Sequence, residues 1–175
     1  MKVVPRTQVP ELVVETVDGS TWSLADQKPK HFTMLVFYRG HHCPLCRKQL
    51  VELDRMVGDF DERGIQVVAV SSNTEELAKR TVADWHIERL TVGFGLGLQD
   101  AQRWGLFVSS AASDAEPEKF TEPGIFVVRP DGTLYASIVQ TMPFSRPPGS
   151  SLLKTLEWVI DNDYPARGEA QLGAQ

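Results

Sequence analysis

Two cysteines separated by two residues are the side chains of this sequence most suited to chemistry. Cys43 and Cys46 lie in the segment RGHHCPLCRK, residues 39–48. At the start of a helix, residues three apart are near enough for one sulfur to attack the other after small adjustments. A CxxC pair that follows a buried strand and opens a helix predicts thiol–disulfide redox chemistry. We therefore take both cysteines as the candidate catalytic residues.

The charge around the pair favours the thiolate, which is the reactive form of cysteine. Arg39, Arg47 and Lys48 are basic, and no Asp or Glu follows them until Glu52. The N-terminus of a helix adds partial positive charge and free N–H groups. Pro44 suits the first helical turn, where its missing N–H costs nothing. The sequence thus predicts a lowered pKa for a thiol of this motif.

Zinc binding and haem attachment are the competing uses of such a motif. His41, His42 and the two cysteines would supply a Cys2His2 set. Adjacent histidines point in different directions, however, and the sequence has no second CxxC and no HxxxH pattern. Attachment of a c-type haem needs CxxCH, and Arg47 stands at the last position of that pattern. We therefore expect no metal and no other cofactor.

A buried strand and a long helix must position the cysteines. Residues 32–38 (FTMLVFY) form a nearly continuous apolar run of strand length, which is typical of a strand buried on both faces. Apolar residues then recur at helical spacing from Leu50 to Phe60, and Gly64 ends the pattern. The cysteines are therefore predicted at the junction of this strand and this helix.

The rest of the chain predicts alternating strands and helices, a closing hairpin and a last helix. This order indicates a mainly parallel sheet with an antiparallel portion. The expected elements are a hairpin at 12–24, a strand at 65–70, a helix at 74–85, a strand at 90–94, a helix at 98–104, a polar surface loop at 109–119, a hairpin at 125–139, a proline-rich loop at 141–149 and a helix over 152–160.

Composition excludes several classes of protein. The 175 residues carry 18 Lys and Arg against 23 Asp and Glu, a formal net charge of −5, which argues against binding to nucleic acid or to an anionic membrane. Two cysteines are too few for a disulfide scaffold. No secretory signal and no apolar stretch of transmembrane length is visible. We expect a cytoplasmic protein with one domain over residues 1–165 and a flexible tail over 166–175.

Residues 37–46 (FYRGHHCPLC) resemble the thioredoxin-fold peroxiredoxin-like proteins of the AhpC/TSA (redoxin) family. Three further segments are similar to the same family, namely residues 9–24, 101–106 (AQRWGL) and 123–132 (PGIFVVRPDG). The resemblance covers roughly residues 9–162. It implies a thioredoxin-like α/β fold, with a central mixed sheet flanked by helices and a peroxiredoxin-type N-terminal β-hairpin.

The resemblance allows two assignments of the attacking sulfur. The peroxiredoxin pattern Pro-x-x-x-Thr-x-x-Cys places the peroxidatic cysteine at Cys46, with Arg39 at the proline position and Cys43 at the threonine position. In the thioredoxin register, Cys43 is the more exposed nucleophile and Cys46 resolves, and Pro123 resembles the cis-proline that faces the CxxC motif. Both assignments stay open at this point.

The resemblance also leaves two supporting roles open. His42 occupies the position where thioredoxins usually carry Trp. It either tunes the thiolate or shuttles protons, or it is a polar residue at the rim of the site. The peroxiredoxin arginine expected just before the strand at 125–128 is not evident. Arg146 is either its substitute or a solvated loop residue, and we expect the latter. The expected supporting residues are Arg39, His42, Pro44, Arg47 and Pro123.

The function implied is that of a thiol-dependent antioxidant oxidoreductase that reduces peroxides through a Cys43/Cys46 dithiol–disulfide cycle. The alternatives are a protein-disulfide or dithiol reductase and a redox-sensing module without turnover. The expected partners are a peroxide or disulfide substrate and an external thiol reductant of the thioredoxin or glutathione type. We expect no nucleic acid and no membrane partner, and the resemblance is consistent with a homodimer.

Overall fold

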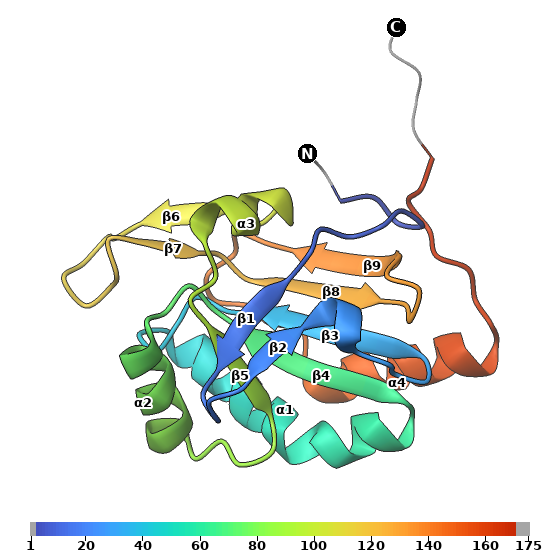
Figure 1. Cartoon of the computed structure of the whole chain (residues 1–175), viewed down its shortest axis with the longest axis horizontal. Coiled ribbons are helices and arrows are strands. Elements are labelled where there is room, and N and C mark those ends of the chain that lie inside the picture. The colour runs from blue at the N-terminus through green and yellow to red at the C-terminus, as the bar shows by residue number, and fades with distance from the viewer. Residues whose placement is uncertain (1–2, 171–175) are drawn as a thin grey trace, which may run out of the picture.

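A mixed seven-stranded sheet forms the centre of the protein, whose structure, a computed structural model, describes residues 3–170. The strands follow the order β2-β1-β5-β4-β3-β8-β9 across the sheet, and two short strands, β6 and β7, pair separately (Figure 1). The strands are β1 (Val13–Thr16), β2 (Thr21–Ser23), β3 (Phe32–Phe37), β4 (Ile65–Val70), β5 (Thr91–Phe94), β6 (Val108–Ser110), β7 (Lys119–Thr121), β8 (Gly124–Val128) and β9 (Leu134–Val139).

Strand direction determines which loops meet at each edge of the sheet. Strand β3 pairs in parallel with β4 and antiparallel with β8, and β8 pairs antiparallel with β9. Strand β9 therefore runs in the same direction as β3. As a result, the segments that follow β3, β4 and β9 and the segment that precedes β8 all lie at one edge of the sheet.

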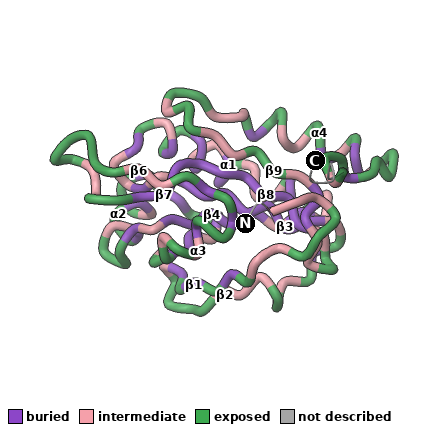
Figure 2. Tube along the Cα trace, turned by 90° about the horizontal axis from the view of Figure 1, so that it is seen from above, coloured by how far each residue is buried: buried purple, intermediate pink, exposed green. Residues whose placement is uncertain are grey.

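The alternation of side chains along the central strands builds two hydrophobic cores, one on each face. Met34 and Val36 of β3 face one core, whereas Leu35 and Phe37 face the other. All six residues of β3 are buried, as the continuous apolar run predicts. Figure 2 shows the buried central strands surrounded by exposed loops and helix surfaces.

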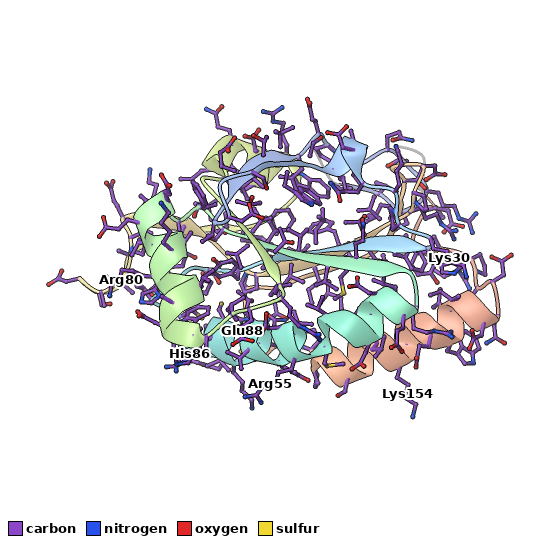
Figure 3. All side chains as sticks on the ribbon, turned by 60° about the horizontal axis from the view of Figure 1, so that its bottom comes forward. Lys30, Arg55, Arg80, His86, Glu88 and Lys154 are labelled. Carbon is purple, nitrogen blue, oxygen red and sulfur yellow. The ribbon has the colours of Figure 1, made fainter. Side chains whose placement is uncertain are left out.

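Helices cover both faces unequally. The helices are α1 (Pro44–Glu62), α2 (Glu75–Trp85), α3 (Leu98–Arg103) and α4 (Gly149–Asp161). Side chains of α1, α2 and α4 belong to the core on one face, and α3 packs into the core on the other. Helices α1 and α4 lie side by side, with the labelled Arg55 and Lys154 pointing away from the sheet (Figure 3). Within residues 3–170, no helix combines the length and the apolar character needed to cross a bilayer.

The predicted strands and helices are confirmed with one exception. The polar segment 109–119 was expected to be a surface loop, but its two ends belong to the antiparallel pair β6–β7. Each of these strands has only three residues, VSS and KFT, which is too short for an apolar alternation to be recognised. The pairing was therefore not visible in the sequence pattern, although it carries residues of the site described below.

The chain after α4 returns to the N-terminal segment. Ala166 is buried, and its carbonyl oxygen accepts a hydrogen bond of 2.8 Å from Nη2 of Arg6. Of the predicted flexible tail, residues 171–175 lie outside the described part of the chain. The boundary at residue 165 stays a prediction.

Candidate active site

The two cysteines lie at the N-terminus of α1, the helix that follows β3 in the chain. Cys43 is the N-cap of this helix and Pro44 its first residue, as predicted. The Cys43 Sγ accepts a hydrogen bond of 3.4 Å from the backbone N–H of Cys46. Both thiols are free, and both residues are buried, with exposed fractions of 2% for Cys43 and 0% for Cys46. Cys43 is thus the more exposed of the two, as expected, although by only a small margin.

The backbone before the helix turns sharply at Gly40, which has a φ of +134°. A Cβ atom at this position would lie 2.5 Å from Nδ2 of Asn73. The Oδ1 of Asn73 accepts a hydrogen bond of 2.9 Å from the backbone N–H of His41. Glycine is thus required both for the backbone conformation and for the approach of Asn73, which fixes the loop that leads to Cys43. Sequence reasoning missed Asn73, although a polar residue just after a buried strand was a usable signal.

Arg146 reaches the two sulfurs from the loop after β9. Its Nη2 lies 3.7 Å from the Cys43 Sγ and 3.5 Å from the Cys46 Sγ. The expectation of a solvated loop arginine is wrong, and the alternative, an arginine that reaches the site, is confirmed. The physical reason is the strand order: β9 ends at the same edge of the sheet as β3.

The two thiols have opposite pKa shifts. The pKa of Cys43 is lowered to about 5, chiefly because the Cys46 thiol donates a hydrogen bond to its sulfur; the Cys46 N–H, Arg146 and Arg39 act in the same direction, against the effect of burial. The pKa of Cys46 is raised, since its proton is held in that hydrogen bond and its sulfur is buried beside Cys43. The pair therefore holds a thiolate on Cys43 and a protonated thiol on Cys46.

Arg39 is bound by the β6–β7 hairpin. Its Nη2 lies 3.2 Å from Oε1 of Glu116, and its Nε lies 3.4 Å from Oε2 of Glu122. The guanidinium also stacks over the ring of Phe120, 4.7 Å from the centroid. Two carboxylates thus offset the charge of Arg39. Arg47 is exposed on α1, and neither a hydrogen bond nor an ion pair joins it to another side chain in the described region. The basic segment of the sequence therefore contributes less to the thiolate than predicted.

The two histidines point to different partners. The ring of His41 stacks on Trp85 at a centroid distance of 5.7 Å, and its Nε2 lies 3.3 Å from Oδ2 of Asp84. The ring of His42 meets Phe120 edge-on at 4.7 Å. Burial and the nearby Arg39 lower the pKa of His42, so this imidazole is neutral at pH 7. Both of its ring nitrogens are buried without a hydrogen-bond partner among the described residues.

Pro123 lies next to the site but not in the predicted conformation. It borders the same small cavity as Arg146 and Gln49. No cis peptide bond occurs within residues 3–170, so the expected likeness to a cis-proline is wrong. The bond has the trans form that most X–Pro bonds adopt. The backbone N–H of Glu122, the residue directly before Pro123, donates a hydrogen bond of 2.8 Å to the Phe107 carbonyl oxygen.

A cleft of about 460 Å³ separates α1 from the loop that carries Arg146. Leu45 and Lys48 line it on the helix side, and Phe144 and Pro147 line it on the loop side. A second cavity, of about 400 Å³, lies between the N-terminal segment and the β8–β9 turn, at the opposite edge of the sheet from the cysteines. Arg146, which contacts both sulfurs, lines the cleft of 460 Å³ and connects it to the cysteines.

Comparisons with known proteins agree with this geometry. The model of the AhpC/TSA family matches residues 5–137. The thiol-disulfide oxidoreductase ResA of Halalkalibacterium halodurans is 22% identical over 99 residues, which are 57% of this chain and 55% of that protein. The chain spans about half the length of the curated relatives it matches.

Solved structures share the fold at low sequence identity. Peroxidoxin BcpB of Mycobacterium tuberculosis superposes with a TM-score of 0.72 at 14% identity, covering 90% of this chain and 98% of that one. Peroxiredoxin 6 of Arenicola marina gives a TM-score of 0.75 at 16% identity, with 98% and 81% covered. The predicted thioredoxin-like fold is thereby confirmed.

Proposed function

This chain belongs to the AhpC/TSA family, and from that premise we propose that it is a thiol-dependent oxidoreductase that reduces peroxides through a Cys43/Cys46 dithiol–disulfide cycle. The observation that carries the proposal is the arrangement of the two sulfurs. One guanidinium group, that of Arg146, contacts both of them within 3.7 Å. A buried dithiol with one lowered and one raised pKa is equipped for attack followed by resolution.

Cys43 is the attacking residue in this proposal. Its thiolate attacks the nearer oxygen of the peroxide, so that an S–O bond forms and the O–O bond breaks. The sulfur is oxidised to a sulfenic acid, and the peroxide is reduced to water or an alcohol once the departing oxygen has taken up a proton. Arg146 stabilises the thiolate before the attack and the negative charge that moves onto the peroxide oxygens during it.

Cys46 completes the cycle as the resolving residue. Its sulfur attacks the sulfenic sulfur of Cys43, which forms the disulfide, and its proton leaves with the departing hydroxide as water. Two external thiols then reduce the disulfide and return both cysteines to the starting state. The low pKa of Cys43 makes it the better leaving group in that last step.

The family pattern assigns the peroxidatic role differently, to the position of Cys46. The raised pKa of Cys46 speaks against an attacking thiolate there. Cys43 also stands where the family carries a threonine, so the hydroxyl of that threonine is absent. We propose that Arg146 substitutes for the family arginine, and that Arg39, His42 and Pro44 support the site by holding the motif. Arg47 and Pro123 receive no chemical role.

Reduction of protein disulfides is the second candidate function. It is favoured by the position of a CxxC motif at a helix N-terminus and by the similarity to ResA, named as a thiol-disulfide oxidoreductase. The same Cys43 thiolate would attack a disulfide sulfur in place of a peroxide oxygen. The burial of both cysteines favours the smaller substrate.

Partners and location follow from the same proposal. We infer a peroxide substrate, a thiol reductant of the thioredoxin or glutathione type, and a cytoplasmic location in which such reductants are abundant. A homodimer is the assembly we infer from the family.

Initial rates test the proposal directly. The full-length protein is assayed with hydrogen peroxide and with cumene hydroperoxide, each with a thioredoxin system, and separately with insulin as a disulfide substrate. We expect peroxide turnover that Cys43→Ser abolishes, a loss of at least about 10³-fold. Cys46→Ser should still consume about one equivalent of peroxide. Insulin reduction without peroxide turnover would favour the second candidate. If peroxide turnover and insulin reduction were both unchanged in the two variants, both candidates would be refuted.

A further inference from the structure

The proposed cycle ends with an external thiol, and the burial of the two cysteines favours a slender one. Cys43 is 2% exposed and Cys46 0%. The thiol of a folded protein is surrounded by the surface of that protein, whereas the thiol of a small peptide can enter a narrow cleft. Arg146, which contacts both sulfurs, lines the cleft of about 460 Å³. The charged residues of this cleft therefore determine which small thiol is recognised next to the disulfide.

Two opposite charges lie one helical turn apart in this cleft. Lys48 and Glu52 both line it, and residues four apart lie on the same side of a helix. Lys48 is exposed, and no ion pair joins it to a carboxylate in the described part of the chain. Glu52 accepts a hydrogen bond of 3.4 Å on Oε1 from the backbone N–H of Ser150, which leaves Oε2 without a partner within residues 3–170. The cleft thus offers one cation and one carboxylate oxygen to a ligand.

We propose that the cleft binds glutathione, with its γ-glutamyl end between Lys48 and Glu52, as the thiol that reduces the Cys43–Cys46 disulfide. The inference rests on the proposed disulfide cycle and names its reductant. The γ-glutamyl end of glutathione is a free α-amino acid, with a carboxylate and an ammonium group on one carbon. Lys48 binds the carboxylate and Glu52 binds the ammonium group, each through a charge-assisted hydrogen bond.

The length of the γ-glutamyl arm fits the distance to the sulfurs. Glu52 follows Cys46 by six residues of α1, which is about 9 Å at a rise of about 1.5 Å per residue. In glutathione, seven bonds join the amino-acid carbon of the γ-glutamyl group to the sulfur, and in the extended form they span about 9 Å. In free cysteine the same two atoms are only about 3 Å apart. The arrangement therefore selects glutathione over cysteine.

The exchange takes place in two steps. The thiolate of the bound glutathione attacks the Cys43 sulfur, so that a mixed disulfide forms and the Cys43–Cys46 bond breaks. Cys46 leaves and takes up the proton that the glutathione thiol has lost. A second glutathione, whose proton passes to solvent, attacks the glutathione sulfur of the mixed disulfide, and Cys43 leaves as a thiolate. The products are glutathione disulfide and the reduced pair.

Formation of the mixed disulfide tests this recognition without any peroxide. In the Cys46→Ser variant, Cys43 is the one remaining cysteine, and its thiolate attacks glutathione disulfide in the reverse of the second step. Mass spectrometry gives the rate, which is compared with the rate for the disulfide of cysteinylglycine, a peptide that lacks the γ-glutamyl group. We expect glutathione disulfide to react about tenfold faster and with saturation, because two charged groups of the ligand are bound.

Variants of the cleft in the same Cys46→Ser background separate recognition from general attraction of an anion. Lys48→Gln should slow the reaction with glutathione disulfide about fivefold. The matched Lys154→Gln removes an exposed charge from α4 (Figure 3) and should leave the rate unchanged. Glu52→Gln keeps an oxygen for the Ser150 N–H but should also slow the reaction, because the ammonium group loses its partner. General attraction would make Glu52→Gln faster, because a negative charge has been removed.

Four outcomes would overturn the assignment of glutathione to the cleft. They are equal rates with the two disulfides, a faster reaction of Glu52→Gln, equal slowing by Lys48→Gln and Lys154→Gln, and no reaction with glutathione disulfide. The proposed function is tested separately, because the assay contains no peroxide. Peroxide reduction can fail while glutathione is still recognised, and recognition can fail while a thioredoxin system still supports peroxide turnover.

Discussion

Two regions of the molecule each place an arginine near Cys43. The two guanidinium groups differ in whether carboxylates neutralise their charge. On the hairpin side, Arg39 is ion-paired with Glu116 and Glu122. On the loop side, Arg146 has carbonyl oxygens and the two sulfurs as its partners, and no ion pair joins it to a carboxylate within residues 3–170. A guanidinium that is already neutralised gives a thiolate little further stabilisation. The comparison therefore assigns charge stabilisation to Arg146 and a structural role to Arg39.

Substitution of Arg146 should have the largest effect on the reaction. Arg146→Gln keeps a polar side chain but removes the positive charge from the sulfurs, so we expect the rate constant for peroxide reduction to fall about 100-fold. Stopped-flow measurement of a single turnover checks this. Arg47→Gln, which removes an exposed charge from the same motif, is the matched control and should leave the rate unchanged. Equal effects of the two variants would contradict the distinction between a contacting and a distant arginine.

Substitution of Arg39 should lower the free energy of unfolding rather than the rate of the reaction. Arg39→Gln leaves the carboxylates of Glu116 and Glu122 without their cation, and the Glu122 side chain is only 7% exposed. We expect the free energy of unfolding to fall by about 2–3 kcal/mol, as measured by urea titration. Arg146→Gln is the comparison variant and should lose less than about 1 kcal/mol. If Arg146→Gln were the less stable of the two, the assignment of roles would be reversed.

Removal of one compensating carboxylate should have the smallest effect. Alkylation of Cys43 by iodoacetamide follows the thiolate fraction, so its rate should fall as the pH drops through about 5. Glu122→Gln retains the shape of the side chain and frees part of the charge of Arg39, which stabilises the thiolate. We expect the midpoint of the pH profile to move lower by less than about one unit. A midpoint that moves higher would show that Glu122 acts by orienting Arg39.

Much of this arrangement was predictable from local patterns. Pro44 at the first position of α1 and Gly64 after its end were visible, as were the buried strand and the position of the CxxC motif between them. These features depend on residues within one turn or one strand of each other, and backbone preferences and apolar periodicity encode them directly. The prediction that the cysteines form a redox pair required nothing more.

The β6–β7 hairpin shows where local patterns stop being informative. Its three-residue strands are too short for an apolar alternation to be recognised, and their pairing brings Phe120 to His42 and Arg39. Strand propensity depends strongly on what a strand packs against. The sequence of this segment therefore predicted a loop, although the segment encloses one side of the site.

The sequence by itself determined the fold class and the helix N-terminus on which the two cysteines sit, and it predicted that they form a redox pair. Only the tertiary structure favours the thiolate form at Cys43, because the lowered pKa of Cys43 depends on the orientation of the Cys46 thiol and on the guanidinium of Arg146, 103 residues away along the chain. The physical reason is the strand order. Strands β3 and β9 run in the same direction with β8 between them, so the loop after β9 emerges beside Cys43, a proximity that is not encoded in the motif itself.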